Sequence, residues 1–186
     1  MRPSNMWGRG ALILLASVIA GVLLNLGSGS PATAASAPAR ATRLDIPAIG
    51  VHAAVIEVGM SGGAQAVTPS AHVVFHWRHG VVPGRRGSAV LAGHTCIFAP
   101  SCAGHGVFNR LGSLRHGNLI HVRVGKHTLT FKVTSVHRHA HPSAKQVRSM
   151  YSTSGPSRLV LFTCGDPHSD GEYGSHVVVR AKRVKK

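Results

Sequence analysis

Residues 118–140, NLIHVRVGKHTLTFKVTSVHRHA, alternate between apolar and polar side chains over most of their length. Alternation with a period of two is typical of a β-strand that buries one of its faces. The pattern is interrupted by VGKH at residues 124–127, where the glycine favours a tight turn. The stretch therefore predicts a β-hairpin with one polar face.

Other short apolar runs, separated by glycine and proline, lie on both sides of this hairpin. They are RLDIPAIGV (43–51), AAVIEVGM (53–60), GSAVLAGHT (87–95), SRLVLFTC (157–164) and HVVVRAKRV (176–184). Helical patterns are confined to two short segments, GHGVFNRLGSL (104–114) and SAKQVRSMY (143–151). Many short strands at near-regular spacing predict a mainly β fold, a closed or nearly closed β-barrel.

The N-terminal segment differs in composition from the rest of the chain. Residues 1–9 carry two arginines, residues 10–27 are uncharged, and residues 28–42 form a linker rich in serine, proline and alanine. We interpret residues 10–27 as an uncleaved transmembrane anchor whose N-terminus lies in the cytoplasm. The alternative is a signal peptide that is cleaved near ATAAS (32–36). In both cases residues 43–186 form one domain that works outside the membrane.

An extracellular address places the three cysteines in an oxidising environment, where disulfides persist. Cys96 and Cys102 are separated by five residues, a gap long enough for a disulfide within one loop. That pairing leaves Cys164 unpaired. An unpaired cysteine is either an inert thiol packed in the core or a reactive residue, and the cysteine count alone does not decide between them.

The chain is strongly basic, with a formal net charge of +16 from 21 lysines and arginines against five acids. These basic residues are dense only in RAKRVKK (180–186), and no base-stacking or zinc-finger motif accompanies them, so we expect no nucleic-acid binding. The membrane face and anionic wall polymers are the expected polyanions. The 14 histidines match no metal-binding spacing and acids are scarce, so we predict no metal and no cofactor.

Two of the predicted strands finish with residues that can do chemistry. One ends at His94 in AVLAGHT (89–95), and the other ends at Cys164 in LVLFTCGD (159–166). If these strands are neighbours that run in the same direction, the imidazole and the thiol share one mouth of the barrel. A thiolate can then attack a carbonyl while the imidazole exchanges protons with the amines that leave and enter.

The order and spacing of three motifs carry a resemblance to a known family. LAGHT (91–95), GVFNRLGSLRHGNLIHV (106–122) and LVLFTCGD (159–166), followed by an apolar strand, resemble the sortases. Sortases are membrane-anchored cysteine transpeptidases of Gram-positive bacteria. The similarity spans nearly all of residues 43–184 and looks greatest to the class E and F enzymes of actinobacteria.

This resemblance implies a closed eight-stranded sortase-type β-barrel with Cys164 and His94 as the catalytic pair. The implied substrates are surface proteins that carry a C-terminal sorting signal of the Leu-Pro-x-Thr-Gly type. The acyl group would pass through a thioester on Cys164 to a cell-wall precursor amine or to water. The implied location is the cell membrane, with a single span and an extracellular catalytic domain. The alternative from another class is a catalytically weak barrel that only binds anionic surface polymers.

Sortases also use an arginine on the last strand, which donates hydrogen bonds to the substrate and to the oxyanion. In YGSHVVVRA (173–181) the matching positions hold Gly174 and His176 instead. Arg180 shares a face with His176 in a period-two strand but lies about 13 Å further along it. Three alternatives follow: His176 donates, Arg180 donates after a register shift, or the donor is weakened or absent.

Overall fold

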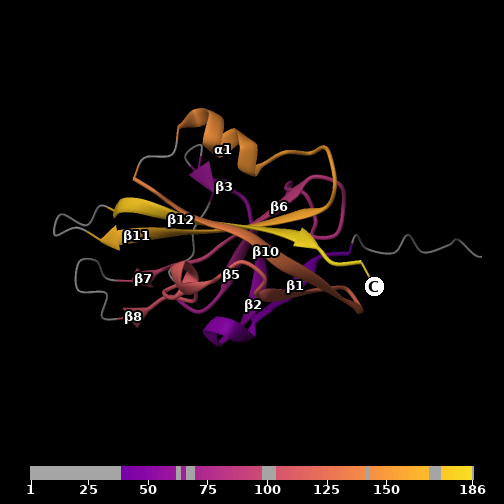
Figure 1. Cartoon of the computed structure of the whole chain (residues 1–186), viewed down its shortest axis with the longest axis horizontal. Coiled ribbons are helices and arrows are strands. Elements are labelled where there is room, and N and C mark those ends of the chain that lie inside the picture. Colours follow the sequence, from indigo (N-terminus) through magenta and orange to yellow (C-terminus); the bar gives the residue numbers. More distant parts are fainter. Residues whose placement is uncertain are drawn as a thin grey trace, which may run out of the picture. The chain divides into compact units, whose positions relative to one another are not determined.

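The structure, a computed structural model, describes residues 39–61, 64–65, 70–97, 104–140, 143–167 and 173–185 (Figure 1). Its elements are β1 (Ala41–Ile46), η1 (Pro47–Ile49), β2 (Val51–Val58), β3 (Met60–Ser61), β4 (Ala64–Gln65), β5 (Val74–Trp77), β6 (Ser88–Ala92), β7 (Cys96–Ile97), β8 (Gly104–His105), η2 (Leu111–Ser113), β9 (Leu119–Val124), β10 (His127–His139), α1 (Ala144–Met150), β11 (Arg158–Pro167) and β12 (Tyr173–Arg183). The predicted hairpin of residues 118–140 is confirmed as β9 and β10.

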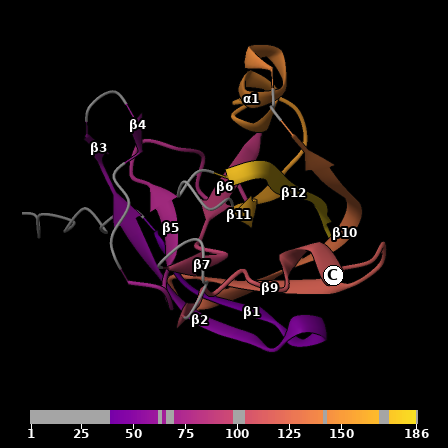
Figure 2. The same ribbon diagram turned by 90° about the vertical axis from the view of Figure 1, so that its left-hand side faces the viewer.

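Eight of the strands close into a barrel in the order β1-β2-β5-β6-β11-β12-β10-β9 (Figure 2). Two neighbouring pairs, β2 with β5 and β6 with β11, are parallel, and the other pairs are antiparallel. The mainly β, closed eight-stranded barrel that the sequence predicts is therefore confirmed. The parallel pair β6 and β11 matters for function, because it brings the C-terminal ends of two strands to the same edge.

Alternate side chains of each strand fill the interior of the barrel. Leu44, Val122, Phe131, Leu161 and Val179 are among the core residues with no exposed surface. The opposite face of β6, β11 and β12 carries a second apolar group, which we call the outer cluster: Val90, Met150, Val160, Val178 and the partly buried Phe162. Met150 belongs to α1, so this helix packs on the outside of the barrel at these three strands (Figures 1 and 2).

A β-bulge in β10 changes which residues of this strand face the interior. The register against β12 shifts between Val133 and Ser135, which inserts one extra residue into β10. Val133 faces the core before the bulge and Val136 packs against the core after it. An uninterrupted period of two would put His139 on the face of Val133, whereas the bulge moves His139 to the outer face.

The two predicted helical segments have different outcomes. Residues 143–151 do form α1, which begins with a capping box: Gln146 N donates to Ser143 Oγ, and the Ser143 N donates to Gln146 Oε1. Residues 104–114 are instead β8, turns and the single 3₁₀ turn η2. Three glycines within those eleven residues weaken a helix, since each one loses more conformational entropy than alanine does.

No helix within the described ranges is long and apolar enough to cross a membrane. The predicted anchor, residues 10–27, lies outside the described residues.

Candidate active site

Cys164 lies near the end of β11 and faces the outside of the barrel. Leu159 and Leu161 of this strand pack in the core, whereas Val160 and Phe162 belong to the outer cluster. The alternation of the strand therefore puts Cys164 on the outer face. The thiol is half-buried and free, and its burial raises the pKa of Cys164 above the ordinary value of 9.0.

His94 follows the end of β6 and lies beside Cys164 in the parallel register. Ala92 of β6 is paired with Phe162 of β11. The pairing continues beyond the strand, because Gly93 N donates to Phe162 O at 3.2 Å and Thr163 Oγ1 donates to the Gly93 carbonyl at 2.7 Å. Two further residues along this register bring His94 opposite Cys164. The condition set for a shared site, that the two strands are neighbours running in the same direction, is therefore met.

Contacts on both sides fix the position of His94. Its ring meets the Phe75 ring edge-on, with 5.4 Å between the ring centroids. The His94 carbonyl accepts a hydrogen bond from Phe108 N at 2.9 Å. Gly106 lies so close that a Cβ there would overlap the His94 carbonyl and come within 2.8 Å of the His94 Cβ. The segment around His94 therefore needs glycine at this position to keep its path.

His176 is the direct cross-strand neighbour of Cys164. The two residues are Cα partners in the antiparallel pair of β11 and β12, so their side chains share the outer face. The His176 ring stacks on Phe162 of the outer cluster, with centroids 5.1 Å apart and an angle of 19° between the rings. On its other side His176 is paired with His139 of β10. The adjacent strands β11, β12 and β10 thus carry Cys164, His176 and His139 in one row, and the segment after β6 carries His94 beyond Ala92.

Arg180 lies on the same strand face but away from the thiol. It is paired with Val160 of β11, four residues from the position opposite Cys164. Its Nη2 donates to the Ser149 Oγ of α1 at 3.1 Å. Of the two candidates for the third catalytic group, the structure brings His176 to Cys164 and holds Arg180 against the helix.

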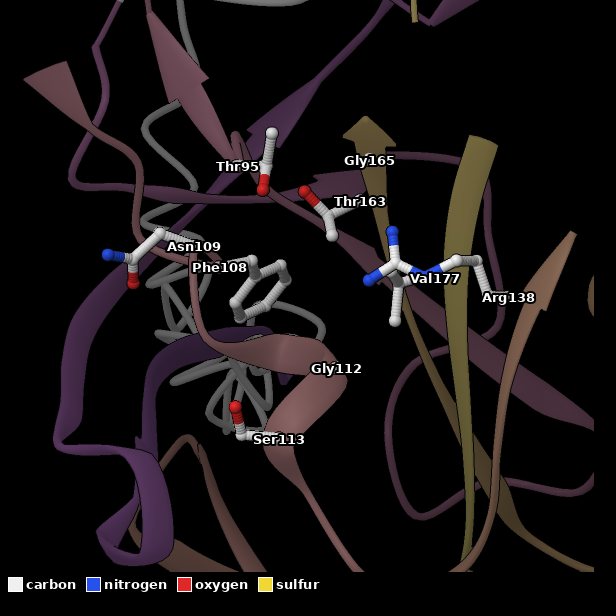
Figure 3. Close-up of a pocket in the computed structure, with 9 residues that line it drawn as sticks. All are labelled: Thr95, Phe108, Asn109, Gly112, Ser113, Arg138, Thr163, Gly165 and Val177. Carbon is white, nitrogen blue, oxygen red and sulfur yellow. The ribbon is translucent and has the colours of Figure 1, made fainter. Parts of the chain in front are cut away.

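Arg138 is a residue near this site that sequence reasoning missed. It follows the bulge in β10 and lines a cavity of about 330 Å³ together with Thr163 and Gly165, the two neighbours of Cys164 (Figure 3). Its Nη1 donates to Ser175 Oγ at 3.2 Å. The guanidinium is also next to Gly165, where an added Cβ would come within 2.9 Å of Arg138 Nη1. Alternation in the sequence gave no signal for this placement, because it depends on the bulge.

The disulfide prediction is supported at one of its two cysteines. Cys96 of β7 is disulfide-bonded, and Cys164 is free. Cys102, the predicted partner, lies outside the described residues. The structure therefore contradicts a disulfide at Cys164, which would have left this thiol unable to react. No group of three histidine, cysteine or acidic side chains in the described ranges is arranged to hold a metal ion.

A comparison with protein families finds a match to the sortase domain over residues 44–184. The chain belongs to the sortase family. A comparison with curated proteins gives no match.

Solved structures of several sortases share the fold. Sortase C-1 from Actinomyces oris matches with 22% identity and a TM-score of 0.59, over 82% of this chain and 77% of that one. The lid mutant of sortase A from Corynebacterium diphtheriae matches with 19% identity and a TM-score of 0.61, over 81% and 74%. A Clostridium perfringens sortase D5 transpeptidase matches with 19% identity and a TM-score of 0.57, over 78% and 79%. The resemblance to classes E and F stays a prediction.

Proposed function

We propose that this sortase is a cysteine transpeptidase that cleaves a sorting signal of the Leu-Pro-x-Thr-Gly type. The observation that supports the proposal is the parallel register of β6 and β11, whose continuation beyond Ala92 and Phe162 leads His94 and Cys164 toward each other. An inert core thiol would face the interior, as Leu161 does. Cys164 instead lies half-buried on the outer face near the end of β11, close to a residue able to exchange protons.

The proposed reaction begins with a neutral thiol. Because burial raises the pKa of Cys164, the thiol keeps its proton at neutral pH until a base accepts it. His94 takes this proton, and the sulfur attacks the carbonyl carbon of the scissile peptide bond. The C–N bond then breaks as His94 returns a proton to the leaving amine, which leaves a thioester on Cys164.

The second half of the reaction uses the same groups in reverse. An amine of a cell-wall precursor, or water, loses a proton to His94 and attacks the thioester carbonyl. The C–S bond breaks, and the thiol of Cys164 regains its proton. We assign the oxyanion donor to His176, because it is the cross-strand neighbour of Cys164 and its ring is held by Phe162. The substrates would be surface proteins with a C-terminal sorting signal, and the membrane anchor of residues 10–27 belongs to this proposal.

The test uses the full chain in detergent with fluorogenic sorting peptides, followed by intact-mass measurement of the acyl-enzyme. We expect a Cys164-linked thioester to accumulate without an acceptor amine and to be released by hydroxylamine. Cys164→Ala and His94→Ala should abolish cleavage, whereas His116→Ala, in an exposed turn, should leave cleavage unchanged. If the wild-type chain does not cleave, or if Cys164→Ala cleaves equally well, the enzyme proposal is wrong. Salt-sensitive binding of anionic wall polymers without cleavage would then favour the alternative of a binding barrel.

A further inference from the structure

A second cavity, of about 920 Å³, lies at the end of the barrel far from the thiol. We call it the basal cleft. Its walls come from the connection between β5 and β6, the turn between β9 and β10, and the residues that end β12. Arg183 at this end is seven residues along β12 from His176, which corresponds to about 23 Å. In Figure 1 the arrowheads of β11 and β12 accordingly point to opposite sides of the barrel.

Basic side chains surround the basal cleft. Arg85, Lys126 and Arg183 line it and are exposed. Arg183 Nη1 donates to the Gly84 carbonyl at 3.3 Å, which fixes the guanidinium to the wall while most of its N–H donors stay available. No acidic side chain lines the cleft in the described part of the chain.

The acids with described side chains are engaged elsewhere. Asp45 lies within 3.2 Å of Arg43, and Glu57 lies within 3.1 Å of Arg40. The positive charge of the basal cleft is therefore not neutralised by these two groups. An anion is the ligand that this charge favours.

Apolar side chains form part of the same walls. Val82, Leu129 and Val184 line the cleft, and Val184 is 38% exposed, which places it among the most exposed large apolar residues described. A basic rim over an apolar wall is the combination that suits the interface of a bilayer, where phosphates meet acyl chains. A soluble anion alone would gain nothing from the apolar part.

The chain leaves the barrel beside this cleft, on the side that leads in sequence to the predicted anchor. Ala39 lines the cleft, and Gly125 N in the β9–β10 turn donates to the Arg40 carbonyl at 3.1 Å. Only the eleven residues 28–38 separate Ala39 from the predicted membrane span that ends at residue 27. Eleven residues span at most about 40 Å. The anchor therefore limits how far the cleft can move from the bilayer.

We propose that the basal cleft binds the phosphate headgroups of anionic phospholipids in the membrane that holds the chain. Arg85, Lys126 and Arg183 contact the phosphates, while Leu129 and Val184 face the interface. Each basic residue near an anionic bilayer strengthens binding by about fivefold. This contact directs the mouth with Cys164 away from the membrane, at the opposite end of the barrel.

The experiment is hydrogen–deuterium exchange on the full chain reconstituted in lipid nanodiscs. One set of discs contains only phosphatidylcholine, and the other contains phosphatidylcholine and phosphatidylglycerol at three to one. We expect the amides of residues 84–86 and 125–129 to exchange at least fivefold more slowly in the anionic discs, and 0.5 M salt to remove the difference, as screening requires. Equal exchange in both discs, or failure of the chain to associate with either, overturns the proposal.

Charge-reversed variants locate the contact. The pair Lys126→Glu and Arg183→Glu should abolish the slower exchange, whereas the matched control Lys145→Glu, exposed on α1, should keep it. Amides of residues 159–161 in the core report that each variant is folded, and Lys126→Gln replaces the pair if the pair unfolds. Equal loss in Lys145→Glu would overturn the proposal. Slower exchange in phosphatidylcholine discs only after addition of a soluble glycerol-phosphate polymer, with no effect of phosphatidylglycerol, would also overturn it and assign the cleft to wall polymers.

Discussion

The replacement of His176 by alanine tests the assignment of the oxyanion donor. His176 is the Cα partner of Cys164, and the Cβ atoms of such a pair lie about 5 Å apart, within reach of an imidazole. Removal of one oxyanion donor typically lowers the rate by about 10² to 10³. We expect kcat of His176→Ala to fall by this factor, with a smaller change in KM. The reason is that the hydrogen bond to the substrate carbonyl oxygen strengthens only as negative charge develops on that oxygen.

The control for His176→Ala is Arg180→Ala, a substitution on the same face of β12. Arg180 lies about 13 Å further along β12, and its guanidinium bonds to Ser149 of α1. Its removal costs one solvent-exposed hydrogen bond, about 0.5 kcal/mol of stability at most, and should change kcat by less than about threefold. His176→Gln keeps an N–H donor and should recover at least about tenfold of the activity that His176→Ala loses.

The assay is steady-state cleavage of a sorting peptide by the full chain, with the alkylation rate of Cys164 as a check that the thiol is intact. Loss of the stack on Phe162 lowers stability by about 0.5–1.5 kcal/mol, so thermal unfolding must be measured in parallel. A His176→Ala variant within threefold of wild type, combined with a hundredfold loss in Arg180→Ala, would refute the assignment and favour Arg180.

Three further predictions concern the thiol, the glycine beside the His94 imidazole, and the core. Because burial raises the pKa of Cys164, the rate of its alkylation by iodoacetamide should keep rising above pH 9. The stability that the neutral thiol contributes should be lost as pH rises through that raised pKa. An alkylation rate that levels off below pH 8 would contradict this prediction. Gly106→Ala should reduce kcat/KM more than tenfold by displacing the imidazole, whereas Gly59→Ala, with open space around it, should be silent in the same assay. Leu161→Ala, fully buried, should lower the free energy of unfolding by about 2–5 kcal/mol in urea titrations, and Leu119→Ala, 41% exposed, by less than about 1 kcal/mol; equal losses would contradict the burial.

The strands were predictable because their pattern is local. The alternation in residues 118–140 and the apolar run before Cys164 follow from the fact that neighbouring side chains of a strand point to opposite faces. That His94 and Cys164 lie near strand ends could be read in the same way, although β6 already ends at Ala92 and β11 runs on to Pro167. Their adjacency needed one further condition, that β6 and β11 are parallel neighbours, and the structure supplies it.

The rest of the site was not predictable, because it depends on pairings between distant strands. The bulge between Val133 and Ser135 turns His139 outward and Arg138 toward the mouth. No residue type in that stretch predicts the bulge, because bulges also form without glycine. Residues 104–114 show a related difficulty. Their apolar spacing favours a helix, but the close packing of Gly106 on His94 imposes an irregular path.

With His176 as the oxyanion donor, kcat/KM should stay high over a narrower pH range than in a site that holds the arginine typical of the family. An arginine donor stays protonated at every pH at which the protein is folded, so only the thiol and the catalytic imidazole would set the profile. If His176 is the donor, its neutral ring still donates one N–H, but only the protonated ring adds a positive charge beside the oxyanion. The protonated fraction of an imidazole falls as pH rises, while the thiolate fraction of the buried Cys164 grows only at high pH. His176→Arg should therefore raise activity on the alkaline side and broaden the profile of kcat/KM. If His176→Arg stays active and its pH profile of kcat/KM is no broader than that of the wild type, the charge of His176 does not set the width of the profile.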